Sequence, residues 1–154
     1  MRNLATLLGS SQIVDLSGRS PRAAVSELVT ALPGPGAALQ KLMLRSVMAR
    51  EATMSTGLGN ALAVPHARLE KLSRIYIALG RSRAGIDFKA PDGMKANLVV
   101  LIVTPNSQVN AYLQLLASVL WTFSDDATRR AVLSAGTAKD VMNVLSRRKG
   151  LQAS

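Results

Sequence analysis

The 154-residue sequence contains no cysteine, a single histidine and few aromatic residues, which make up 3% of the chain. Without cysteine there is no disulfide, and both thiolate catalysis and thiolate metal sites are excluded. One imidazole, that of His66, cannot form a histidine-rich metal site. We therefore expect no metal ion and no other cofactor.

Long apolar runs are also missing. The longest, Leu98–Val103, is far shorter than the roughly 20 residues that span a bilayer, and Leu4–Leu8 is too short for a signal peptide. We expect a cytoplasmic protein without membrane insertion. The length suits one domain over residues 1–154, and the 48% of hydrophobic residues can fill its core.

Negative charge is scarce, because 9 Asp and Glu residues face 19 Lys and Arg residues, for a net charge of +10. Such a surplus raises the possibility of nucleic-acid binding. However, the cations are spread evenly, and their only run is Arg147-Arg148-Lys149. There are also few rings on which bases would stack. A solvated basic surface is the preferred interpretation, with nucleic-acid binding kept as an alternative.

Helical and extended patterns alternate along the chain. Ser20-Pro21 is typical of a helix start, because Ser caps free amides and Pro suits the first turn. The other expected elements are strands over Gln12–Leu16, Ala61–Val64, Ile75–Leu79 and Leu98–Val103, a helix over Ala37–Glu51, a helix with the apolar stripe Val109, Tyr112, Leu113, Leu116, Leu120 and Phe123, and short helices over Ala127–Leu133 and Ala138–Leu145. This order predicts an α/β fold with a mixed sheet between helices.

The setting of His66 suggests phosphoryl chemistry. We expect His66 at the end of the strand over 61–64, beside a loop with the hydroxyls of Ser55 and Thr56 and several backbone amides. Arg50 ends the preceding helix and Arg68 lies two residues beyond the histidine. Amides and guanidinium groups bind phosphate, and a neutral imidazole is a nucleophile. Together they favour phosphoryl transfer to His66.

Plainer interpretations stay open. A lone histidine is often structural, Gly57 and Gly59 are compatible with a simple tight turn, and Arg50-Glu51 with an ordinary charged helix end. A triad of Ser55, His66 and Asp87 is conceivable, but the chain has no nucleophile-elbow sequence.

The stretch from Arg50 to Arg68, REATMSTGLGNALAVPHAR, resembles the phosphorylation-site signature of enzyme IIA domains of the fructose/mannitol class, which belong to the bacterial sugar phosphotransferase system and its nitrogen-regulatory branch. An acidic residue, an apolar-small pair and the ending apolar-Ala-apolar-Pro-His-small all match in spacing. Ile86-Asp87-Phe88, Asp92-Gly93 and Leu98–Pro105 follow in family order, so the resemblance covers nearly the whole chain.

The resemblance implies a three-layer α/β sandwich with a mixed sheet of about five strands. It implies that His66 accepts a phosphoryl group from a small HPr-like phosphocarrier protein, and that Arg50 steadies this group. His66 would then pass it to a permease domain or hold it as a regulatory mark. The chain contains no permease part, which favours the nitrogen-type role. The roles of Ser55, Thr56 and Arg68 are supporting ones, inferred from their chemistry alone.

The chain departs from the family at Tyr112. Members usually place a second histidine near the start of the long helix, and Tyr112 stands where it is expected. A phenol donates one hydrogen bond but stays neutral at pH 7, so it compensates less phosphate charge. Tyr112 is equally compatible with core packing. An interaction module that kept the fold without transferring phosphate is therefore the alternative function. The net charge of +10 also suggests a donor unlike the usual one.

Overall fold

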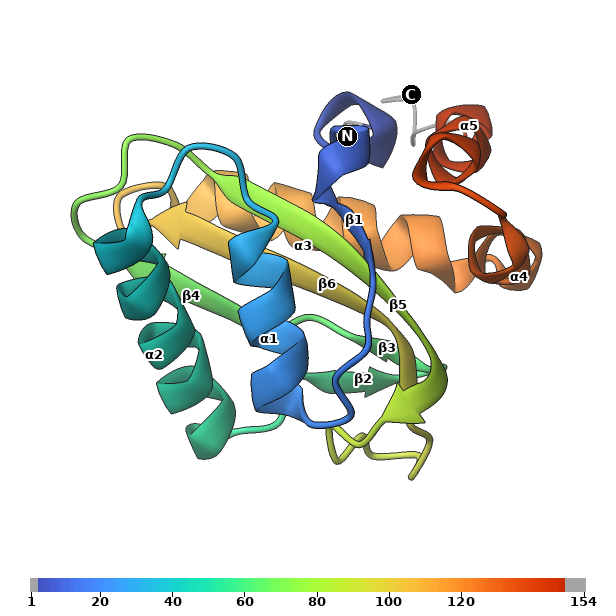
Figure 1. Cartoon of the computed structure of the whole chain (residues 1–154), viewed down its shortest axis with the longest axis horizontal. Coiled ribbons are helices and arrows are strands. Elements are labelled where there is room, and N and C mark those ends of the chain that lie inside the picture. The colour runs from blue at the N-terminus through green and yellow to red at the C-terminus, as the bar shows by residue number, and fades with distance from the viewer. Residues whose placement is uncertain (1–2, 149–154) are drawn as a thin grey trace.

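The computed structural model describes residues 3–148. Figure 1 shows a central twisted sheet with helices on both of its faces. The strands are β1 (Ile13–Asp15), β2 (Gly57–Gly59), β3 (Leu62–Ala63), β4 (His66–Leu69), β5 (Tyr76–Ile86) and β6 (Ala96–Pro105). The helices are α1 (Pro21–Thr30), α2 (Ala37–Thr53), α3 (Val109–Ser124), α4 (Asp126–Ser134) and α5 (Ala138–Arg147), with short 3-10 helices over Leu4–Thr6 and Ser10–Gln12.

The sheet is mixed, as expected. Its order is β1-β5-β6-β3-β2, and β4 also pairs with β6. The β5–β6 and β2–β3 pairs are antiparallel, whereas β1–β5, β3–β6 and β4–β6 are parallel. Within residues 3–148, no helix is long and apolar enough to cross a membrane.

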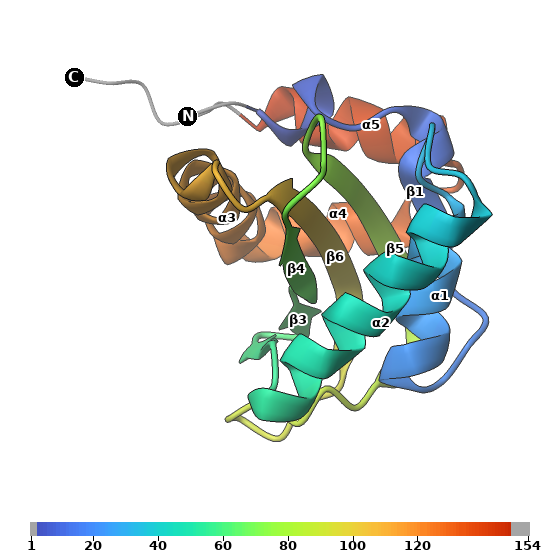
Figure 2. The ribbon, with the colours of Figure 1, turned by 90° about the vertical axis from the view of Figure 1, so that its left-hand side faces the viewer.

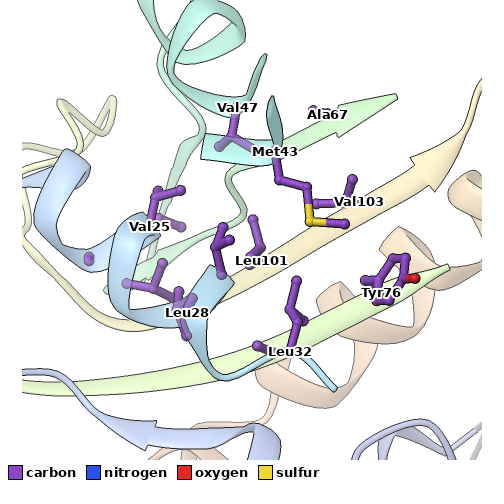
Figure 3. Close-up of a cluster of buried hydrophobic side chains, with 14 of the residues drawn as sticks. Val25, Leu28, Leu32, Met43, Val47, Ala67, Tyr76, Leu101 and Val103 are labelled. Carbon is purple, nitrogen blue, oxygen red and sulfur yellow. The ribbon is translucent and has the colours of Figure 1, made fainter. Parts of the chain in front are cut away.

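Alternate residues of β6 enter two separate cores. Val99, Leu101 and Val103 face α1 and α2, in the cluster that Figure 3 shows, whereas the side chains between them pack with α3, α4 and α5. A strand that is buried on both faces must be continuously apolar, which explains the run that begins at Leu98. The two cores give the predicted three-layer α/β sandwich, and so confirm the fold class.

Helix α1 begins as the sequence predicts. The Ser20 hydroxyl accepts a hydrogen bond from the Ala23 amide, and Pro21 takes the first helical position. Helix α2 continues two residues beyond the predicted end, to Thr53.

His66 follows the strand predicted over 61–64, which is β3, but it also begins a further strand, β4, which was not predicted. Leu62 pairs with Leu98 and His66 with Ile102, so β3 and β4 keep the same register against β6 across the break at Val64-Pro65. The carbonyl of Pro65 still accepts a hydrogen bond from the Ile102 amide, at 3.1 Å. β3 and β4 are therefore one interrupted strand, and its second half carries the histidine.

Strand β5 continues beyond the predicted end at Leu79, through the polar residues Arg81 and Ser82, which are buried. The Arg81 guanidinium forms a 2.8 Å salt bridge with Asp15 on β1 and donates to two carbonyls at the end of α4. Because its charge is paired, Arg81 can be buried within β5. The apolar pattern alone therefore predicted too short a strand.

The buried face of helix α3 differs from the apolar stripe that the sequence shows. This face consists of Leu115, Ser118, Val119, Thr122 and Phe123. Of the predicted stripe, Val109, Leu113 and Leu120 are exposed. The stripe is therefore only partly the buried face: Tyr112, Leu116 and Phe123 pack on the core, and the other three leave apolar side chains on the surface.

Candidate functional site

Helix α2, the segment that follows it, strand β4 and the first turns of α3 enclose an open cleft of about 730 Å³. Figure 2 shows β4 between α2 and α3. The six residues that the sequence singled out all line this cleft: Arg50, Ser55, Thr56, His66, Arg68 and Tyr112. The fold thus gathers residues from a helix, a loop, a strand and a second helix.

The imidazole of His66 is held by its own backbone. Its Nδ1 lies 3.0 Å from the carbonyl oxygen of Val64, at the break between β3 and β4. A carbonyl only accepts hydrogen bonds, so Nδ1 carries the proton and Nε2 keeps a free lone pair. Burial lowers the pKa of His66 below its usual 6.5, and the positive charges of Arg50 and Arg68 act in the same direction. The ring is therefore neutral, and Nε2 is nucleophilic, at pH 7.

Tyr112 lies against this histidine. The two ring centroids are 5.2 Å apart and the ring planes are tilted by 35°. Tyr112 is half-buried and also packs on the core beneath α3, which confirms the core-packing interpretation, while a role toward a phosphoryl group stays a prediction. Burial raises its pKa above the usual 10, so the phenol is neutral at physiological pH.

Two arginines supply the positive charge of the cleft. The Arg50 side chain reaches around the end of α2, where Nη1 donates to the Met54 carbonyl at 3.0 Å. Arg68 is exposed on β4, two residues after His66 and therefore on the same face of the sheet. Guanidinium groups on two sides of a nucleophilic nitrogen suit the binding of a phosphoryl group.

The two hydroxyls of the loop are engaged within the protein. Ser55 donates its hydroxyl hydrogen to the Phe88 carbonyl, and Thr56 donates its own to the Glu51 carboxylate. Glu51 also accepts from the Thr56 amide at 3.0 Å. In this structure Ser55 and Thr56 therefore shape the loop and have no hydroxyl hydrogen left for an anion.

Glu51 is a residue whose role sequence reasoning missed. Its carboxylate ties the loop to the last turn of α2, next to Arg50. The signal was present, because an acidic residue opens the matched stretch. The role of Glu51 was overlooked because a charged pair at a helix end, such as Arg50-Glu51, is usually exposed to solvent and has no further function.

Steric constraints explain why glycine occupies positions in this loop. A Cβ on Gly57 would come within 2.9 Å of the Phe88 carbonyl oxygen and 3.1 Å of Ala90 Cα. After Gly59, the hairpin between β2 and β3 turns through Asn60 and Ala61, which have positive φ angles of 53° and 61°. The interpretation of this segment as a tight turn is confirmed.

The hydrolase-like triad finds no geometric basis. The exposed carboxylate of Asp87 accepts from the Lys89 amide. Among the described residues, no hydrogen bond joins His66 to either Asp87 or Ser55.

Comparisons with known proteins agree with this geometry. The family described as "Phosphoenolpyruvate-dependent sugar phosphotransferase system, EIIA 2" matches residues 9–148. The fructose-specific EIIA component of Haloferax volcanii is 31% identical over 103 residues, 67% of each chain. The fructose-specific EIIABC component of Bacillus subtilis is 25% identical over 134 residues, 86% of this chain but only 21% of that longer protein.

A solved structure shows the same fold. The nitrogen regulatory protein IIA-Ntr from Neisseria meningitidis superimposes with a TM-score of 0.81 at 27% identity, covering 92% of this chain and 98% of that one. With the family match over most of the sequence, the chain belongs to the EIIA type 2 family of the phosphoenolpyruvate-dependent sugar phosphotransferase system.

Proposed function

We propose that the protein is a phosphohistidine carrier that accepts a phosphoryl group on Nε2 of His66. The observation that carries the proposal is the hydrogen bond from Nδ1 to the Val64 carbonyl, which leaves Nε2 as the nucleophile in an arginine-lined cleft. The family's general role in phosphotransfer gives the reaction class.

The proposed step exchanges one nitrogen–phosphorus bond for another. The lone pair of Nε2 attacks the phosphorus of a phosphohistidine on a small phosphocarrier protein. The bond between that phosphorus and the donor's ring nitrogen breaks, and its electron pair returns to the donor's ring, which leaves as a neutral imidazole because its other nitrogen carries a proton. His66 keeps its proton on Nδ1, so the positive charge passes to the phosphorylated ring. The protein mainly has to position the reactants and stabilise spread negative charge.

Arg50 and Arg68 are proposed to hold the phosphoryl oxygens. Both lie close enough to the imidazole to lower its pKa, so both would also balance charge on a phosphoryl group bound there. Tyr112, with its ring centroid 5.2 Å from that of His66, is proposed to limit the movement of the ring and to offer a neutral O–H donor.

A regulatory role of the nitrogen type is the favoured use of the phosphoryl group. The IIA-Ntr structure, with a TM-score of 0.81 and 27% identity, supports this choice. The acceptor would be a regulatory target or a permease domain, and the cytoplasm remains the predicted location.

Intact-mass analysis tests the transfer. The protein is incubated with phosphoenolpyruvate and the two upstream carriers, and separately with phosphoramidate, a small chemical phosphoryl donor. We expect one added phosphoryl group on the wild type and on the control Asn106→Ala, which alters a cleft residue without an assigned role. His66→Ala should take up none. A control IIA domain that is labelled while this protein is not would contradict the proposal.

A non-transferring interaction module is the second candidate, favoured by the neutral Tyr112 where relatives usually have histidine. It predicts that the protein carriers label Tyr112→His and not the wild type. It also predicts that a regulatory partner binds His66→Ala as tightly as wild type.

A further inference from the structure

The rim of the His66 cleft is unusually apolar. Within residues 3–148, seven large hydrophobic side chains are exposed. Four of them line this one cleft: Met54, Leu58, Val109 and Leu113, with exposures of 68%, 45%, 40% and 53%. Clustered apolar side chains around a reactive group are typical of a protein interface.

These four side chains come from two walls of the cleft. Met54 and Leu58 lie in the segment after α2, and Val109 and Leu113 lie in the first turns of α3, which Figure 2 shows across β4 from α2. Residues 106–124, which include all of α3, contain no charged side chain. The wall that α3 forms is therefore apolar or neutral throughout.

The charge of the cleft has one sign. Among residues 3–148, the charged residues that line it are Arg50 and Arg68, and no acidic residue does so. The nearby carboxylate of Glu51 accepts two hydrogen bonds from Thr56, which is itself buried. Its charge acts on His66 but is offset by two arginines.

Three other acidic side chains are occupied in the same way. Asp15 pairs with Arg81, and Asp126 with Arg129 and Arg130. Asp125 caps α4 through Thr128. Since the chain has a net charge of +10, these carboxylates leave the cleft in a positive field.

We propose that this rim docks a protein whose contacting face has an apolar centre bordered by Asp and Glu, and that this protein is the phosphoryl donor. The proposal rests on the proposed function and adds the chemistry of the partner. Charge complementarity steers such encounters and raises their rate. The apolar rim and the lack of stacking rings favour a protein over a nucleic acid as the occupant.

The first experiment separates docking from chemistry. Leu113→Gln is compared with Leu120→Gln, a similarly exposed leucine on the same helix that does not line the cleft. Each labelling rate with a phosphorylated carrier protein is divided by the rate with phosphoramidate, which needs no docking surface. We expect this ratio to fall about tenfold for Leu113→Gln and to stay unchanged for Leu120→Gln. Equal ratios in both variants would overturn the docking surface.

The second experiment tests the sign of the charge. Two versions of one small phosphocarrier are phosphorylated chemically beforehand, one with Lys and Arg around its histidine and one with Glu at those positions. The acidic version should transfer about tenfold faster at low salt, and its advantage should shrink as salt rises. Arg68→Gln should reduce the rate with the acidic version more than the rate with phosphoramidate.

The outcomes separate the two proposals. A faster basic version, or rates that do not depend on carrier charge, would overturn the acidic partner while leaving the carrier function intact. Labelling by phosphoramidate but by neither carrier would refute protein-to-protein transfer, and the acidic partner with it. Tight duplex DNA binding that blocks carrier labelling would assign the positive rim to nucleic acid instead.

Discussion

At the residue scale, two features of the structure determine the tautomer and the pKa of His66. The Val64 carbonyl fixes the proton on Nδ1, and burial lowers the pKa of the ring. Since the nucleophile is the neutral form, the lowered pKa keeps His66 reactive to lower pH than a free imidazole, although the hydrogen bond to Val64 by itself raises the pKa. The neutral Tyr112 beside it adds no positive charge of its own.

We predict that His66 titrates below pH 6.5, with a higher pKa in Arg50→Gln, because that change removes a cation that disfavours the imidazolium. The chain has one histidine, so a single ring-proton signal in an NMR titration reports its pKa directly. Arg22→Gln, at the start of α1 and outside the cleft, is the matched control and should not change it. A wild-type pKa at or above 6.5 would contradict the burial argument.

The same shift affects folding. Above pH 6.5 the ring is neutral in both states and contributes no pH dependence. Below it the unfolded chain takes up the proton first, so stability falls as the pH drops from 6.5 toward the lower pKa of the folded state. His66→Gln should remove this part of the pH dependence of unfolding.

At the element scale, the turn between β2 and β3 contains strain. Ala61 has a φ of 61°, a left-handed conformation that its Cβ disfavours. We expect Ala61→Gly to stabilise the protein by about 0.5–1 kcal/mol, measured by urea unfolding. Ala49→Gly, on the exposed face of α2, should instead destabilise it by about 1 kcal/mol. A loss of stability in Ala61→Gly would show that this turn is not strained.

Elements with local signals were predictable. The cap at Ser20 and the apolar run from Leu98 placed α1 and β6 correctly, because capping and continuous burial are visible in the sequence. The buried face of α3 was not, because its stripe includes Leu113 and Leu120, which remain on the surface. Apolar residues have the same helical spacing whether they pack on the core or lie on an exposed surface, so the spacing alone does not identify the buried face.

That the candidate-site residues lie together in one cleft was predictable from the sequence. Five of its six residues lie in one contiguous stretch, from Arg50 to Arg68, so a local match was enough to find them. Their interactions were not predictable. The distant Phe88 carbonyl is the acceptor of the Ser55 hydroxyl, and only the folded chain brings the two together.

At the scale of the whole molecule, uncompensated positive charge is the main feature. The three salt bridges among the described residues involve Arg81, Arg129 and Arg130, against a net charge of +10. Self-repulsion of this kind destabilises a compact state and is screened by salt.

We therefore expect the melting temperature to rise by about 2–4 °C between roughly 20 and 200 mM NaCl, measured by circular dichroism. Lys139→Glu reverses one exposed cation in the first turn of α5, where an acidic side chain also suits the helix dipole. This variant should show a smaller salt effect. A melting temperature that falls with salt would mean that attractive pairs outweigh the repulsion.

The interruption at Val64-Pro65 has a consequence for dynamics. The carbonyl that selects the tautomer of His66 belongs to the same strand break that returns the chain to β6 in register. A movement that separated His66 from the Val64 carbonyl would remove that acceptor and leave the proton free to move between the two nitrogens. The nitrogen of His66 that can react thus depends on the geometry of the strand break, because the same residues supply the acceptor and keep β4 in register with β6.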